Sequence, residues 1–157
     1  MGVQSLEPDL LRLLGRRHTA DEAIESYHRL REAGFLNISL DLMYGLPHQT
    51  LKQWADSLDT TLELKPEHIS LYGLQIENGT PLQVDVAKGR YPVPDDDLAA
   101  DMYEEAQRRV DAGEGPETLA RLAEVGPLRL AREAARGGVE GCWLVIYSVF
   151  AQARIHT

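Results

Sequence analysis

A carboxylate lies inside a strand-like run near the start of the chain. Residues Ser39 to Met43 contain Asp41, and the chain then turns through Tyr44-Gly45-Leu46-Pro47 toward a helix. Burying a carboxylate without partners is costly, so Asp41 must face either donor groups of the protein itself or a polar ligand. From spacing alone, ligand binding and structural hydrogen bonding carry equal weight.

Two predicted strands, Leu36 to Met43 and His68 to Leu74, share an alternation of apolar and polar residues. Strands of an open doubly wound sheet tend instead to be apolar on both faces. We therefore predict an α/β fold with parallel strands, forming all or part of a β/α barrel whose polar face holds a ligand. Such barrels carry their chemistry at the carboxyl ends of the strands, where Asp41 and the loop 44–49 fall. Gln4 takes the same place on a first, cut-off strand.

Helices with recognisable start signals separate these strands. Pro8 opens a short apolar helix near the beginning of the chain. Thr19 and Glu22 have the spacing of a capping box, so a second helix begins there and ends at Gly34. Thr50 caps a third helix. The order of strands and helices predicts parallel β/α units.

The second half of the chain gives weaker signals. The connection 76–93 is long enough to be a functional excursion, and a helix follows from about Leu98 to Ala112. Beyond Val110 the chain narrows to few residue types, which is what a GC-rich gene read out of frame would yield. The alternative is a genuine helix, Pro116 to Arg136, followed by an apolar strand, Cys142 to Phe150. We favour the frameshifted or otherwise unnatural terminus.

Composition excludes several classes of protein. A net charge of -9 over 157 residues argues against a nucleic-acid partner and against an anionic membrane surface. No apolar run is long enough to span a bilayer and no signal peptide is visible, so we expect a cytoplasmic protein with a small-molecule ligand. The single cysteine, Cys142, and five scattered histidines offer no metal site.

Four stretches of the sequence resemble one known family. They are "GVQS…LLRLLGRRHTADEAIE", "AGFLNISLDLMYGLPHQT", "LKPEHISLYGLQIENGTPL" and "PVPDDDLAADMYEEA". Together they are similar to the oxygen-independent coproporphyrinogen III oxidase family of radical S-adenosylmethionine (SAM) proteins. The wording "HISLYGLQIENGTPL" is closer to the heme-chaperone (HemW-like) branch than to the oxidase branch. The resemblance runs from Gly2 to about Val110.

This resemblance implies a partial (β/α)6 barrel that binds SAM beside a [4Fe–4S] cluster. Residues 1–94 would be the carboxyl-terminal part of the barrel, 95–112 the following helix and 113–157 an atypical tail. Family positions that contact SAM match Gln4, Arg16 and Asp41, and Gln75 falls where the family uses a backbone contact near the adenine. A guanidinium suits the SAM carboxylate, while amide and carboxylate groups suit its hydroxyl and amine donors.

The resemblance also implies what this chain lacks. The family's CxxxCxxC loop precedes the first residue in family order, so the chain reads as a fragment missing the amino-terminal half of the barrel. Cys142 cannot replace three cluster ligands, so this chain alone binds no cluster and contributes no catalytic residue. The parent is either an oxidase acting through a SAM-derived radical or a heme chaperone, with heme as a further ligand. The alternative is a truncated product without activity.

Overall fold

The computed structural model describes residues 1–111, 122–123 and 144–145. Three parallel strands, β1 (Gly2–Gln4), β2 (Ser39–Tyr44) and β3 (His68–Gly73), form a sheet in the order β1-β2-β3. Two further strands, β4 (Leu122–Ala123) and β5 (Leu144–Val145), pair in parallel, and β5 contacts β3. The predicted α/β class with parallel strands is therefore confirmed for the described part of the chain.

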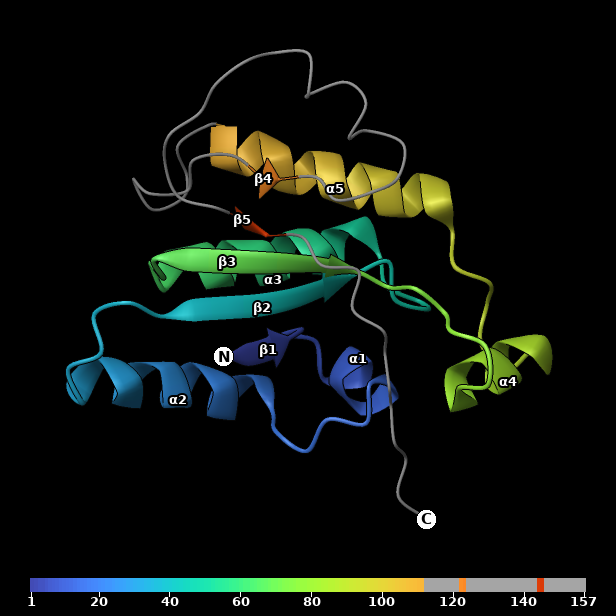
Figure 1. The fold of residues 1–157 in the computed structure, drawn as a ribbon, viewed down its shortest axis with the longest axis horizontal. Coiled ribbons are helices and arrows are strands. Elements are labelled where there is room, and N and C mark those ends of the chain that lie inside the picture. The colour runs from blue at the N-terminus through green and yellow to red at the C-terminus, as the bar shows by residue number, and fades with distance from the viewer. Residues whose placement is uncertain (112–121, 124–143, 146–157) are drawn as a thin grey trace.

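Helices connect and flank these strands. Helices α1 (Pro8–Leu13) and α2 (Ala20–Glu32) link β1 to β2, and α3 (Leu51–Glu63) links β2 to β3. Figure 1 shows α3 behind the sheet, α2 along the β1 side and α5 (Asp96–Asp111) on the β3 side. Helices α1 and α4 (Pro81–Ala87) lie toward the end at which the strand arrows point.

The helix starts follow the predicted caps. At α2, the Thr19 hydroxyl accepts from the Glu22 N–H at 3.2 Å, and the Glu22 carboxylate accepts from the Thr19 N–H at 2.7 Å. At α3, Thr50 and Gln53 form the same reciprocal pair, at 3.2 Å and 2.9 Å. Two of the donors that each helix start would leave unpaired are thus satisfied by short-range sequence.

Some predicted bounds were wrong. Strand β2 begins at Ser39 rather than Leu36. Ser39 pairs with His68, the first residue of β3. Before it, the Ile38 N–H donates to the Glu67 carboxylate at 2.8 Å instead of to a neighbouring strand. Helix α5 begins two residues early, because the Asp95 carboxylate accepts the N–H groups of residues 97 and 98 at 3.0 Å each.

Helix α4 was missed within the connection 76–93. Its signals were Thr80, whose hydroxyl accepts the Gln83 N–H at 3.2 Å, and Pro81 in the first turn. Within the range 116–136, for which a helix was the alternative, the two described residues form β4 instead. Strand β5 lies inside the apolar strand of that same alternative. The rest of that segment, including Cys142, falls outside the described residues.

The outer face of the sheet is sealed by helices. Its core combines apolar side chains of β2 and β3 with others from α2, α3 and α5; the strand members are Leu40, Leu42, Ile69 and Leu71, and the helix members include Tyr27, Trp54, Leu58, Met102 and Ala106. Each fully buried side chain of this size contributes about 1.5–3 kcal/mol. The Trp54 Nε1–H also donates to the Met102 carbonyl at 2.6 Å, which fixes α5 against α3. The predicted apolar face of β2 and β3 is therefore confirmed, whereas on the opposite face Met43 is buried in a second apolar cluster with Leu10 and Leu46.

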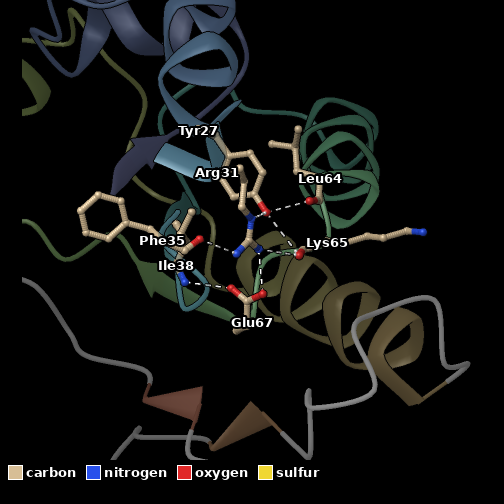
Figure 2. A network of polar contacts seen from close by, with 7 residues as sticks. All are labelled: Tyr27, Arg31, Phe35, Ile38, Leu64, Lys65 and Glu67. Carbon is tan, nitrogen blue, oxygen red and sulfur yellow. Dashed lines mark hydrogen bonds and ion pairs between the residues drawn. The ribbon is translucent and has the colours of Figure 1, made fainter. Parts of the chain in front are cut away.

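A network of polar contacts fastens the amino end of the sheet (Figure 2). Arg31 on α2 donates from Nε to the Tyr27 hydroxyl at 2.8 Å, and from Nη2 to the Lys65 carbonyl at 3.0 Å and the Glu67 carboxylate at 2.8 Å. The Tyr27 hydroxyl in turn donates to the Leu64 carbonyl at 2.8 Å. A stabilising role for this end of the sheet agrees with β/α barrels, whose ligand chemistry lies at the opposite, carboxyl end of the strands.

We predict that Glu67 makes stability depend on pH in the acid range. Burial raises the pKa of Glu67, but hydrogen bonds from Arg31 and the Ile38 N–H together lower it below its ordinary value of 4.5. Because folding lowers this pKa, the ionised Glu67 carboxylate stabilises the folded protein above pH 4.5. This stabilisation is lost as the pH falls through the folded-state pKa. Urea unfolding of wild type and Glu67→Gln, at pH 7 and below pH 4.5, measures the difference.

The wild-type free energy of unfolding should fall more steeply than that of Glu67→Gln, by about 1 kcal/mol or less, since exposure weakens the ion pair. The exposed Glu63 at the end of α3 offers a matched control, because it has no place in the network. Equal acid slopes for wild type and Glu67→Gln would contradict the prediction.

Candidate functional site

The carboxyl edge of the sheet is the candidate site. Gln4 ends β1, the loop from Gly45 to Gln49 follows β2, and Gln75 comes two residues after the end of β3. The three strands run in the same direction, so these positions share one edge, with α1 and α4 beyond it (Figure 1). Ligand sites of parallel α/β folds lie at this edge.

Gln4 has an unusual backbone conformation for its residue type. Its φ of 68° lies in the left-handed region, and the pairing of β1 with β2 is irregular between Gly2 and Gln4. The Gln4 Nε2 lies 2.7 Å from where a Cβ on Gly2 would be, so a larger residue at position 2 would displace the end of the Gln4 side chain. Non-glycine residues in this region cost of order 1–3 kcal/mol and cluster at functional sites.

Neighbouring contacts hold Gln4 in place. The His18 Nε2–H donates to the Val3 carbonyl at 3.2 Å, and the buried Ser5 hydroxyl accepts from the Glu7 N–H at 3.1 Å. His18 was missed by sequence reasoning, which found the histidines scattered and without metal spacing. Its role toward β1 depends on a contact across 15 sequence positions, and no local pattern signals it.

Asp41 lies midway along β2, on the polar face. Its register partners are Gly2 on β1 and Ser70 on β3, so it sits deeper in the sheet than Gln4, which pairs with Leu42. One carboxylate oxygen lies 3.7 Å from the Met1 amino group, and the side chain is 28% exposed. Asp41 thus has a structural partner and also a solvent-facing side that a ligand can reach.

A histidine shares that polar face. Burial lowers the pKa of His68, and the Asp41 carboxylate opposes this shift. His68 pairs with Ser39, two register steps from Asp41 and on the same face, so the Asp41 carboxylate favours the charged form of the ring.

The other two predicted SAM contacts are exposed. Arg16 follows α1 and donates its backbone N–H to the Leu11 carbonyl at 2.9 Å, while its guanidinium has no hydrogen bond to another described residue. Gln75, two residues after β3, is also exposed. No hydrogen bond or ion pair joins Gln4, Arg16, Asp41 and Gln75 to one another within the part of the chain that the structure describes.

A buried glutamine shapes the loop after β2. Gln49 is 3% exposed; its Oε1 accepts from the Leu46 N–H at 3.0 Å and its Nε2 donates to the Met43 carbonyl at 3.4 Å. Gly45 has a φ of 71°, and a Cβ there would meet the Ala99 Cβ of α5 at 3.4 Å. Sequence reasoning treated Gln49 only as part of the loop, because its partners are backbone groups.

These side chains suit SAM but not its cluster. The unused Arg16 guanidinium, the partly exposed Asp41 carboxylate and the Gln4 amide match the carboxylate, ammonium and hydroxyl groups of SAM. Among residues 1–111, 122–123 and 144–145, no group of three or more metal-binding side chains is found. The described helices also include none long and apolar enough to cross a membrane.

Comparison with known proteins gives the class. Residues 1–61 match the model of the radical SAM superfamily. The chain is 45% identical over 111 residues to the heme chaperone HemW of Bacillus subtilis, covering 71% of this chain and 29% of that protein. It is 41% identical over 132 residues to a mouse mitochondrial radical SAM domain-containing protein 1, covering 82% and 29%.

A solved structure agrees. The coproporphyrinogen III oxidase HemN of Escherichia coli, described as a radical SAM enzyme, superposes with a TM-score of 0.61 at 26% identity, over 71% of this chain and 26% of that one. The matched part of this chain is thus a segment of the radical SAM type, with a partial-barrel fold. More particularly, the predicted resemblance to the coproporphyrinogen III oxidase-like family and its heme-chaperone branch is confirmed. The chain spans about 29% of the length of the first relatives it matches.

We predict that glycine is better tolerated than alanine at position 4. The φ of 68° is strained for alanine but not for glycine. The free energy of unfolding of Gln4→Gly should therefore exceed that of Gln4→Ala by about 1 kcal/mol. Gln75 lacks a positive φ and serves as the control position. There, the alanine variant should be at least as stable as the glycine variant. Thermal and urea unfolding of the four variants measures both differences. If the order at position 4 matched that at 75, Gln4 would not be strained.

Proposed function

We propose that this chain forms the carboxyl-terminal part of a radical SAM barrel in a protein that handles heme. Residues 1–94 supply barrel strands and helices, 95–112 the following helix, and 113–157 an atypical tail. Support comes from α5, whose Met102 and Ala106 join the same core as the strands. A match of 112 residues, the length that precedes the tail, covers 71% of the chain. The mouse match covers 82%, so the mouse match includes part of the tail.

Within this proposal, the carboxyl edge binds SAM. Arg16 takes the carboxylate of SAM, Asp41 and Gln4 take amine and hydroxyl donors, and Gln75 lies near the adenine. SAM together with a [4Fe–4S] cluster supplies radical chemistry in this family, and the cluster ligands must come from outside this chain. The left-handed Gln4, anchored on both sides, supports a binding role at the end of β1.

Heme is the proposed cargo. The observation that carries this is the 45% identity to a heme chaperone over 111 residues, which is higher than the 26% identity to the oxidase structure. The second candidate is an oxygen-independent coproporphyrinogen III oxidase, favoured by the superposition on HemN. Its reaction would remove carboxyl groups from propionate side chains.

The proposed partners are small molecules and the remainder of the barrel. Nucleic acid is not among them, because a net charge of -9 would repel phosphates. A cytoplasmic location also belongs to this proposal, although the mouse relative is mitochondrial by name.

A chimera tests the proposed function. Residues 1–157 are joined behind the part of the Bacillus subtilis relative that precedes its matched region, and iron and sulfide are added under anaerobic conditions. Absorbance titration with heme gives the binding stoichiometry, and chromatography follows coproporphyrinogen III in the presence of SAM and a reductant. We expect stoichiometric heme binding and unchanged coproporphyrinogen III.

The Bacillus segment without residues 1–157 is the control, and it should show neither property. Decarboxylation of coproporphyrinogen III would favour the second candidate and reject the chaperone. Absence of both heme binding and decarboxylation would reject a role in heme handling.

A further inference from the structure

Helix α5 contacts the first residue of the loop that follows β2. Met102 of α5 is fully buried, and its Sδ accepts a hydrogen bond from the Gly45 N–H at 3.4 Å, across 57 sequence positions. A Cβ at position 45 would lie 3.4 Å from the Ala99 Cβ, three residues before Met102. Residues three apart share one face of a helix, so one face of α5 borders the start of the loop.

Met102 is itself fixed relative to the sheet. The Trp54 Nε1–H of α3 donates to the Met102 carbonyl at 2.6 Å. The Trp54 ring also lies beside the Tyr44 ring at the end of β2, with centroids 5.5 Å apart. The sulfur that accepts from the loop is therefore held by contacts with both α3 and the end of the strand.

The contact occurs where the pairing of β2 ends. Strand β2 stops at Tyr44, so the next N–H groups need acceptors outside the sheet. The Gly45 N–H uses the Met102 Sδ. The Leu46 N–H uses the Gln49 Oε1 at 3.0 Å. Gln49 belongs to the loop and moves with it, whereas Met102 ties the loop to a separate helix.

The backbone of the loop turns at the same point. Gly45 has a φ of 71°, in the left-handed region that glycine adopts without strain. The loop then borders the carboxyl edge, where the proposed SAM groups lie. Its position therefore affects how closely its backbone approaches SAM, and a loop that is ordered beforehand costs less to bind.

We propose that Met102 is a positioning residue for the proposed SAM site. From α5, its sulfur holds the loop 45–49 at the rim of the carboxyl edge, so the loop is already ordered when SAM binds. Met102 acts through Gly45, because its own side chain is fully buried. This inference rests on the proposed SAM binding and adds α5 to the elements on which that binding depends.

Amide exchange in the full chain tests the contact. Met102→Leu removes the sulfur acceptor and nearly conserves the side-chain volume. The Gly45 amide should then exchange with deuterium about tenfold faster, as expected for the loss of one hydrogen bond. The Leu46 amide, whose acceptor is Gln49, should keep its rate. Leu58→Met makes the reverse exchange in the same core and should change neither rate, as measured by NMR.

A second pair of variants disturbs the contact without changing the sulfur. Ala99→Val enlarges the side chain nearest Gly45, whereas Ala100→Val makes the same change at an exposed position of the same helix. Both changes carry the same cost in helix propensity. In calorimetric titrations of SAM into the chimera, Met102→Leu and Ala99→Val should each weaken affinity by about three- to tenfold. Leu58→Met and Ala100→Val should bind SAM as the wild type does.

Three results would overturn the inference alone. One is a Gly45 amide whose exchange is unchanged in Met102→Leu. Another is wild-type SAM affinity in both Met102→Leu and Ala99→Val. The third is an equal loss of affinity in Ala100→Val, which would trace the effect to the stability of α5. A wild-type chimera that binds no SAM would instead reject the proposed SAM site, and the inference with it.

Discussion

The parallel pairing of β2 with β3 is the constraint on which the remaining structure depends. Its register runs without interruption from Ser39 opposite His68 to Tyr44 opposite Gly73. Because side chains alternate along each strand, this register sends Leu40 and Ile69 to the helix-covered face. A slip of one residue would bury the carboxylate of Asp41 among the helices, and the polar face would vanish.

The two ends of the sheet use this constraint differently. At the amino end, the Arg31 and Glu67 side chains form hydrogen bonds with each other, and they join α2, the α3–β3 connection and the residue before β2. At the carboxyl end, Gln4 and His48 have left-handed backbones beside anchored neighbours, a conformation that Lys65 also has at the amino end. The amino edge thus supplies stability, and the proposed ligand site lies at the opposite edge of the same three strands.

Local chemistry explains how much of this was predictable from sequence. The caps at Thr19 and Thr50 and the alternation around Asp41 are short-range signals, and they gave the helix starts and the polar face. The late start of β2 depends on Glu67, the position of β1 depends on His18, and the loop shape depends on Gln49, all through contacts with distant or backbone groups. Of the four predicted SAM contacts, Gln4 and Gln75 share the carboxyl edge by topology, while Asp41 lies midway along β2 and Arg16 follows α1, and sequence spacing alone does not fix whether they converge on one ligand.

The central claim is that the polar face of β2 belongs to a SAM site. In the chimera, Met1 is no longer a chain terminus, so the ammonium 3.7 Å from Asp41 is replaced by a peptide bond and its structural role is removed. Calorimetric titration of SAM into the chimera and its Asp41→Asn variant then tests ligand binding directly, with Ser39→Ala on the same face as the control. Loss of a charged hydrogen bond should weaken binding by about tenfold in Asp41→Asn, with little change in Ser39→Ala. Equal affinity of Asp41→Asn and wild type for SAM would contradict the claim.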